Sequence, residues 1–216
     1  MEKWRQARKD TEHGADGTRS IGPEAPIRIA GRDRRSTLRS RPVSDAHHTI
    51  EVEPDARGLR IAVVVSRYNR NVTDRLLDGA ATEFRRLGGR PEDLLVIPAP
   101  GAFELVVLAR AALERVDAVV ALGCLIRGET RHDRVIGDSV AAELARLGVD
   151  TGKAVGFGLL TVETPEQAAA RSQPLGREAS SLAPGSAKAP VDNKGVEAMA
   201  AAVLTARTLE KIRNRT

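Results

Sequence analysis

The segment Arg127–His132 holds the residues of this sequence that are best suited to acid–base and anion chemistry. An unperturbed histidine titrates near pH ~6.5, so His132 is a natural proton carrier. Gly128 allows a close approach of the backbone to a ligand, Thr130 adds a hydroxyl donor, and free N–H groups at a helix start favour an anion. The segment is therefore typical of a phosphate or oxyanion cradle, although it lacks the spacing of a P-loop. On this segment alone, a surface histidine at a helix start remains the alternative.

The aromatic residues are few, and their positions add to this interpretation. Aromatics make up only 2% of the chain. Tyr68 and Phe103 follow the first two expected strands, where a ring can stack on a planar heterocycle. Phe157 lies inside the fourth expected strand. Phe103 and Phe157 can also be plain core residues, and for Phe157 this is the more natural interpretation.

Two further side chains have ordinary explanations. Arg171 follows a short expected helix, where a cation is common because of the helix dipole. Cys124 is the single cysteine, which excludes an internal disulfide. It has no clear cationic partner in the sequence, so we expect a buried structural thiol. No cluster of His, Cys, Asp and Glu has the spacing of a metal site.

These residues need strands and helices to bring them together, and the hydrophobic pattern predicts both. Short apolar runs rich in β-branched residues predict strands buried on both faces over 61–65, 94–97, 118–122 and 154–160. Apolar positions at a 3.6-residue period predict helices over about 72–87, 102–115 and 133–147. Thr164 opens a short helix with a capping box, and Asp192-Asn193 caps a last helix that runs to about Arg213.

The alternation of strands and helices predicts the fold class α/β. We expect a three-layer sandwich with a four-stranded parallel, flavodoxin-like sheet and helices on both faces. Ligands of such sheets bind at the carboxyl ends of the strands. The functional residues should therefore lie in the loops 66–71, 98–102, 123–132 and 161–164.

The excess positive charge is concentrated at the start of the chain. Residues 1–42 hold 11 of the 34 Lys and Arg and 6 of the 29 Asp and Glu, so the rest of the chain carries equal numbers of both signs. We expect residues 1–57 to be a basic, disordered N-terminal extension, and 58–216 to be one domain with an irregular insert at about 172–191. The neutral body argues against a nucleic-acid-binding protein, and phosphate binding by the arginines of the extension stays open.

The sequence also favours a cytoplasmic protein without a membrane partner. No apolar run approaches the ~18 residues that a membrane helix needs. The first residues are charged and lack the apolar segment of a secretory signal.

Six short stretches occur in the order in which one known family has them. They are Ser66-Arg67-Tyr68-Asn69, Pro100-Gly101-Ala102-Phe103-Glu104, Leu122–Thr130 followed by His132, Gly158-Leu159-Leu160-Thr161, Glu166-Gln167-Ala168 with Arg171, and Asn193-Lys194-Gly195. Each stretch alone is weak, but the combination is specific. Over about residues 58–213 the chain resembles the 6,7-dimethyl-8-ribityllumazine synthases.

The resemblance implies a transferase of riboflavin biosynthesis. In that reaction 5-amino-6-(D-ribitylamino)uracil condenses with 3,4-dihydroxy-2-butanone 4-phosphate through imine formation, loss of phosphate and ring closure. The resemblance implies no metal and no organic cofactor. Proximity and proton transfer would therefore supply the catalysis.

The resemblance also implies a role for each matching residue around the pyrimidine substrate. Tyr68 would stack on the pyrimidine ring, where the family usually has Phe or Trp. The ribityl chain would contact Ala102, Phe103 and Glu104. The pyrimidine would contact the backbone of Cys124, Leu125 and Ile126.

A second set of matching residues would handle the phosphate and the protons. Glu129 and Thr130 would bind the phosphate through backbone N–H groups, with Arg171 as its counter-charge. His132 would be the catalytic proton donor and acceptor.

An assembly with shared sites follows from the same resemblance. Phe157 would cover the site of a neighbouring subunit, with Lys194 close by, in a homo-oligomer built of pentamers. Packing in the core of its own chain and forming a wall for the next chain's site are compatible roles for Phe157. A pentamer, a decamer and an icosahedral shell all agree with the sequence, and riboflavin synthase is a candidate partner.

Three departures from the family pattern leave alternatives open. Asp133 stands where Phe is more usual, Ala170 stands where many members have Glu, and the insert lengthens the path from Arg171 to Asn193. Asp133 and the insert motivate the alternative of a non-catalytic flavin- or lumazine-binding shell protein of the same fold. In a third hypothesis, residues 1–42 recruit an acidic partner to the assembly.

Overall fold

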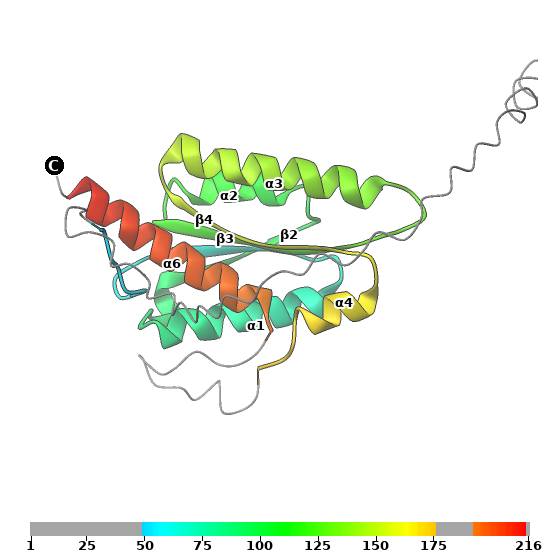
Figure 1. The fold of residues 1–216 in the computed structure, drawn as a ribbon, viewed down its shortest axis with the longest axis horizontal. Coiled ribbons are helices and arrows are strands. Elements are labelled where there is room, and N and C mark those ends of the chain that lie inside the picture. The colour runs from blue at the N-terminus through cyan, green and yellow to red at the C-terminus, as the bar shows by residue number, and fades with distance from the viewer. Residues whose placement is uncertain (1–48, 176–191, 215–216) are drawn as a thin grey trace, which may run out of the picture. The chain divides into compact units, whose positions relative to one another are not determined.

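In the computed structural model, strands and helices form a three-layer α/β arrangement that matches the hydrophobic pattern (Figure 1). The structure describes residues 49–175 and 192–214, which belong to one compact unit, His48–Thr216. The expected basic extension up to residue 48 and the expected insert from 176 to 191 lie outside the described residues. Among the helices that are described, none is both long and apolar enough to cross a membrane.

A four-stranded parallel sheet forms the middle layer, as expected. Its strands are β1 (Ile61–Ser66), β2 (Leu94–Ala99), β3 (Ala118–Ile126) and β4 (Ala154–Val162), in the order β2-β1-β3-β4. β1 and β3 are central and buried along nearly their whole length, which explains their continuous apolar sequences. From β1 the chain goes to β2 on one side and then crosses back to β3 on the other. The winding direction therefore reverses between β1 and β3.

Helices cover both faces of the sheet (Figure 1). One face carries α2 (Leu105–Ala112) and α3 (His132–Thr151), and the other carries α1 (Arg70–Arg86), α4 (Pro165–Ala170) and α6 (Lys194–Arg213). A separate hydrophobic core lies on each face of the sheet. Phe84 and Met199 are fully buried on the α1 side, and Leu105 and Leu144 are buried on the α2 side. Burial of each such side chain contributes about 2 kcal/mol to folding.

The last helix packs very closely on its neighbours. A Cβ atom at Gly195 would lie 1.9 Å from the carbonyl oxygen of Leu76 in α1, so only glycine fits there. A Cβ atom at Gly156 of β4 would lie 2.4 Å from the carbonyl oxygen of Ala198. These two approaches hold α6 against both α1 and the sheet, and they fix the position of its first residues.

Several element ends differ from the expected ones because pairing and turn geometry decide them. β3 continues beyond residue 122 to Ile126, since β4 pairs with it as far as Ile126 opposite Val162. The stretch 123–126 is therefore strand rather than loop. α2 is shorter than the expected 102–115, and α3 continues past 147 until Gly152 ends it at φ 61°. A short 3₁₀ turn over Pro91–Asp93 has no counterpart in the expected pattern.

Both expected helix caps are confirmed. The Thr164 side chain accepts a hydrogen bond from the Gln167 N–H at 3.3 Å. The Asn193 side chain accepts hydrogen bonds from the first two N–H groups inside α6 that follow Lys194. Each cap satisfies backbone donors that the helix itself cannot satisfy.

Candidate active site

A cavity of about 720 Å³ opens at the carboxyl ends of the strands, where the winding reverses between β1 and β3. Its volume and position suit a small-molecule ligand. The cavity is lined by Tyr68, Asn69, Gly101, Ala102, Phe103, Glu104, Cys124, Leu125, Ile126, Gly128, Thr130, His132, Asp133, Val135 and Ile136. The chain segments that follow β1, β2 and β3 thus bring together most of the residues that the sequence proposes.

Asn69 ties the first of these segments to β3. Its backbone lies in the left-handed region at φ 54° and ψ 50°, which asparagine tolerates better than most residues. Its side-chain Nδ2 donates a hydrogen bond to the carbonyl oxygen of Cys124 at 2.9 Å. Asn69 therefore bridges the reversal point of the sheet. Sequence reasoning assigns it no role, although an asparagine between a strand and a helix is the signal that points to such a turn.

Two aromatic rings stand at the cavity with most of their surface free. Tyr68 is 73% exposed and Phe103 is 64% exposed, so the interpretation of Phe103 as a core residue is wrong. Ring faces exposed at a cavity can stack on a planar ligand. Gly101 lets the Glu104 carboxylate lie against the same loop, because a Cβ atom there would be only 3.0 Å from Glu104 Oε2.

His132 is the first residue of α3 and lines the cavity with Gly128 and Thr130. The residue before it, Arg131, makes no side-chain cap to the helix. The N–H groups of the first turn are therefore suited to an anion. His132 is exposed, so it can exchange protons with a ligand and with solvent. This arrangement can transfer a proton next to a bound anion.

Two other members of the segment Arg127–His132 are placed differently. Arg127 donates a hydrogen bond to the Glu163 carboxylate at 2.5 Å, and this contact raises the pKa of Arg127. Glu129 is exposed and is not one of the described residues that line the cavity. The part of the segment that faces the cavity therefore consists of Gly128, Thr130 and His132.

Cys124 provides the cavity with a backbone group rather than a reactive thiol. The residue is buried, which confirms the expected structural thiol. Burial raises the pKa of the Cys124 thiol from 9.0 to about 11, so the thiol stays protonated at neutral pH and is a poor nucleophile. Across the part of the chain that the structure describes, no group of three or more His, Cys, Asp or Glu could hold a metal ion.

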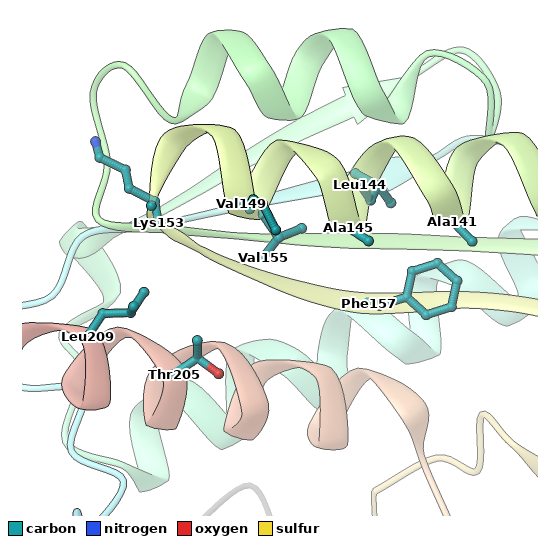
Figure 2. A pocket seen from close by; sticks show the side chains of 11 residues that line it. Ala141, Leu144, Ala145, Val149, Lys153, Val155, Phe157, Thr205 and Leu209 are labelled. Atoms are coloured by element: carbon teal, nitrogen blue, oxygen red, sulfur yellow. The ribbon is translucent and has the colours of Figure 1, made fainter. Parts of the chain in front are cut away.

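Phe157 lies outside this cavity, in a second cavity of about 660 Å³ between α3, β4 and α6 (Figure 2). It is 50% exposed, so the expectation that it packs in the core of its own chain is wrong. Figure 2 shows the ring on β4 beside Ala141 and Ala145 of α3, with Thr205 and Leu209 contributed by α6. The alanine side chains are too short to cover the ring, which leaves it at an apolar, open groove.

Arg171 and Lys194 also lie apart from the cavity with His132. They stand where α4 ends and α6 begins, on the face of the sheet opposite to α3. Both cations are paired, Arg171 with Asp192 at 2.6 Å and Lys194 with a carboxylate of its own helix at 2.7 Å. Within one chain the expected site residues therefore lie mainly at three places, which are the cavity with His132, the groove with Phe157, and the junction of α4 and α6.

The fold and the cavity define an α/β protein that binds a small molecule at the reversal point of a parallel sheet, beside a histidine at a helix start. Comparison with known families narrows this class. The family model described as 6,7-dimethyl-8-ribityllumazine synthase matches residues 58–210. The chain belongs to the 6,7-dimethyl-8-ribityllumazine synthase family.

Relatives of moderate identity carry the same name. A 6,7-dimethyl-8-ribityllumazine synthase of Corynebacterium efficiens is 44% identical over 160 residues, which cover 74% of this chain and 91% of the relative. One of Thermus thermophilus is 42% identical over 159 residues, covering 73% and 92%. One of Nitratidesulfovibrio vulgaris is 38% identical over 166 residues, covering 76% and 97%. The similarity therefore extends over nearly the whole length of these relatives.

Proposed function

We infer that the protein is a 6,7-dimethyl-8-ribityllumazine synthase, a transferase of riboflavin biosynthesis. It joins 5-amino-6-(D-ribitylamino)uracil to 3,4-dihydroxy-2-butanone 4-phosphate and releases phosphate and water. The observation that carries this conclusion is the meeting of His132, Tyr68 and Phe103 at one cavity in a chain of this family. The relatives are named as synthases, which favours a catalyst over a non-catalytic shell protein.

The cavity suggests how the pyrimidine substrate is held. Tyr68 stacks on the planar ring, since its face is free. The ribityl chain lies along the start of α2, where it contacts Ala102, Phe103 and Glu104. The ring edge meets the backbone at the end of β3, formed by Cys124, Leu125 and Ile126. In this arrangement rigid strands orient the amine toward the second substrate, which reduces the entropy lost on reaction.

The start of α3 suggests how the second substrate reacts. Its phosphate lies at the N–H groups of Glu129 and Thr130, while its carbonyl carbon meets the amine. Attack of the amine forms an imine and releases water, and the phosphate then leaves with its oxygen. Ring closure needs protons to be removed and returned, and we assign both steps to His132.

A second copy of the chain would complete the site. Phe157, Arg171 and Lys194 are not among the described residues that line the cavity with His132 in one chain. Phe157 stands instead at an open apolar groove of the kind that subunit interfaces cover. We propose that these three residues reach the cavity of a neighbouring copy, with Arg171 as counter-charge to the phosphate, in a homo-oligomer built of pentamers.

The remaining expectations belong to the same proposal. The cytoplasm is the proposed location, and riboflavin synthase is the proposed protein partner. Residues 58–216 form the proposed catalytic domain, and residues 1–57 its basic extension.

A stoichiometric assay tests the proposed function. Purified full-length protein is mixed with both substrates, and the lumazine product and inorganic phosphate are measured together. One phosphate is expected for each lumazine formed. A folded sample that binds the pyrimidine substrate but forms no lumazine would instead support the non-catalytic shell protein.

A further inference from the structure

Three of the cations that the sequence singles out are held by carboxylates in the folded chain. The pairs are Arg127 with Glu163 at 2.5 Å, Arg171 with Asp192 at 2.6 Å, and Lys194 with Glu197 at 2.7 Å. A phosphate that approaches one of these cations meets a neutral ion pair rather than a free positive charge. Binding of the phosphate must therefore compete with an internal anion.

The pair of Arg171 with Asp192 differs from the others because the backbone itself holds it in place. Ser172 and Asn193 form an isolated antiparallel bridge between the two chain segments. One backbone hydrogen bond lies on each side of this bridge. The Gln173 N–H donates to the carbonyl oxygen of Asp192 at 3.2 Å, and the Lys194 N–H donates to the carbonyl oxygen of Arg171 at 2.9 Å. Arg171 and Asp192 are therefore diagonal neighbours across the bridge, in a fixed register. Because the backbone already holds them close together, their ion pair forms with little further loss of conformational entropy.

The carboxylate of Asp192 is poorly satisfied apart from this contact. Its Oδ2 accepts from Arg171 Nη1, while its buried Oδ1 has no hydrogen-bond partner among the described residues. A buried acceptor without a donor is costly, so this carboxylate is held less favourably than one whose two oxygens both accept hydrogen bonds. Arg171 is 53% exposed and can present its guanidinium to another anion. A phosphate brings more negative charge than a carboxylate and can accept several N–H groups at once.

We propose that Asp192 competes with the phosphate group for Arg171 and so sets the affinity of the site for phosphorylated substrate and for released phosphate. The proposal rests on the proposed function, which places Arg171 against the phosphate. Asp192 either leaves Arg171 when phosphate binds or stays beside it as a repelling charge. In both cases Asp192 weakens phosphate binding, and it promotes release of inorganic phosphate after reaction.

The substitution Asp192→Asn tests the proposal, because it removes the charge and keeps the size of the side chain. Binding of inorganic phosphate to the full-length protein is measured by titration calorimetry, and KM is measured for each substrate. Loss of one exposed ion pair should strengthen phosphate binding about two- to fivefold. KM for the phosphorylated substrate should fall by a similar factor, whereas KM for the pyrimidine should not change. Asp192→Ala should act in the same direction.

Two further variants control for general charge effects and for the identity of the cation. Glu114→Gln removes a carboxylate that pairs with Arg110 at 3.1 Å near the C-terminal end of α2, and it should leave phosphate binding unchanged. When Asp192→Asn is combined with Arg171→Ala, the gain in phosphate affinity should disappear.

The outcomes separate this proposal from the proposed function. Unchanged or weaker phosphate binding in Asp192→Asn, an equal gain in Glu114→Gln, or no phosphate binding to either the natural chain or the variant overturns the role of Asp192. Tighter phosphate binding in a protein that forms no lumazine would leave the competition in place and remove the proposed function instead.

Discussion

At the scale of single residues, two titratable groups of the cavity, His132 and Cys124, differ in their exposure. His132 lies at the start of α3 with free access to ligand and solvent, which a proton carrier needs. Cys124 lies deeper, and desolvation keeps its thiol neutral. We therefore propose the imidazole rather than the thiol for acid–base chemistry in the cavity, and the cysteine contributes its carbonyl oxygen to the hydrogen bond from Asn69.

Replacing His132 should slow the reaction without preventing binding. In His132→Ala, kcat should fall about 10²- to 10⁴-fold, the usual contribution of a positioned general acid–base. The dissociation constant of the pyrimidine substrate should change little, because stacking and the ribityl contacts remain. Steady-state kinetics and fluorescence titration measure the two quantities. A kcat close to that of the natural chain would show that another group carries the proton.

The raised pKa of Cys124 predicts a stability that falls in alkali. Its pKa is about 11 in the folded chain against 9.0 for an ordinary thiol, so above pH 9 the unfolded state releases the proton first. The folded state is then destabilised between pH 9 and 11, by up to about 2 kcal/mol at the top of this range. Urea unfolding at pH 8 and pH 10.5 measures the loss, and Cys124→Ala should show a smaller one. An equal loss in both proteins would assign the effect to other groups.

At the scale of elements, Asn193 connects three parts of the chain. Its Nδ2 donates to the carbonyl oxygens of Arg75 in α1 and of Gln173 after α4, each at 3.0 Å. Its Oδ1 accepts from the N–H of Gly195 at 2.9 Å and from the next N–H of α6. The residue is fully buried, so each of these bonds replaces water that cannot reach it. Asn193 thereby fixes the place where Arg171 and Lys194 stand.

Removal of the Asn193 side chain should therefore destabilise the fold. Asn193→Ala loses a helix cap and leaves two buried carbonyl groups without donors, which together cost about 2–4 kcal/mol. Chemical denaturation measures the free energy of unfolding. Asn214→Ala, at the exposed C-terminal end of the same helix, is the matched control and should change it by less than about 0.5 kcal/mol. Equal effects of the two substitutions would contradict the role given to Asn193.

At the scale of the whole molecule, the expected site residues do not all meet within one chain. α3 brings His132 to the cavity from one face, while α4 and α6 hold Arg171 and Lys194 on the other. Phe157 lies at the groove between α3, β4 and α6, half exposed and apolar. In a closed ring of identical copies, Phe157, Arg171 and Lys194 of one chain would complete the cavity of the next chain.

Mixing two inactive variants tests whether sites are shared between copies. His132→Ala and Arg171→Ala are each expected to be impaired, because each lacks one half of every site. In a ring assembled from equal amounts of both chains, about a quarter of the interfaces would have neither substitution and should recover turnover. The activity of co-expressed variants, compared with a mixture of separately assembled ones, provides the measurement. No gain over the separate samples would place both residues in one chain's site.

Much of the fold could be predicted from local features of the sequence. The apolar runs of β1 and β3 and the caps Thr164 and Asn193 act within a few residues, so pattern and spacing are enough. The parallel sheet follows from their alternation, because crossovers between parallel strands need a helix's length of chain. Residues at the ends of three strands were therefore predictable members of one cavity.

The remaining features depend on partners far away in the sequence, and only the tertiary structure decided them. β3 extends to Ile126 because β4 lies beside it, and Asn69 finds a carbonyl acceptor 55 residues away. Phe157 is uncovered because the facing side chains of α3 are alanines, which composition alone does not place opposite it. Arg171 meets Asp192 because a bridge joins the end of α4 to the start of α6. The sequence by itself determined the alternation of strands and helices and most of the residues that line the cavity. The packing of distant segments decided which charges are free to bind a substrate.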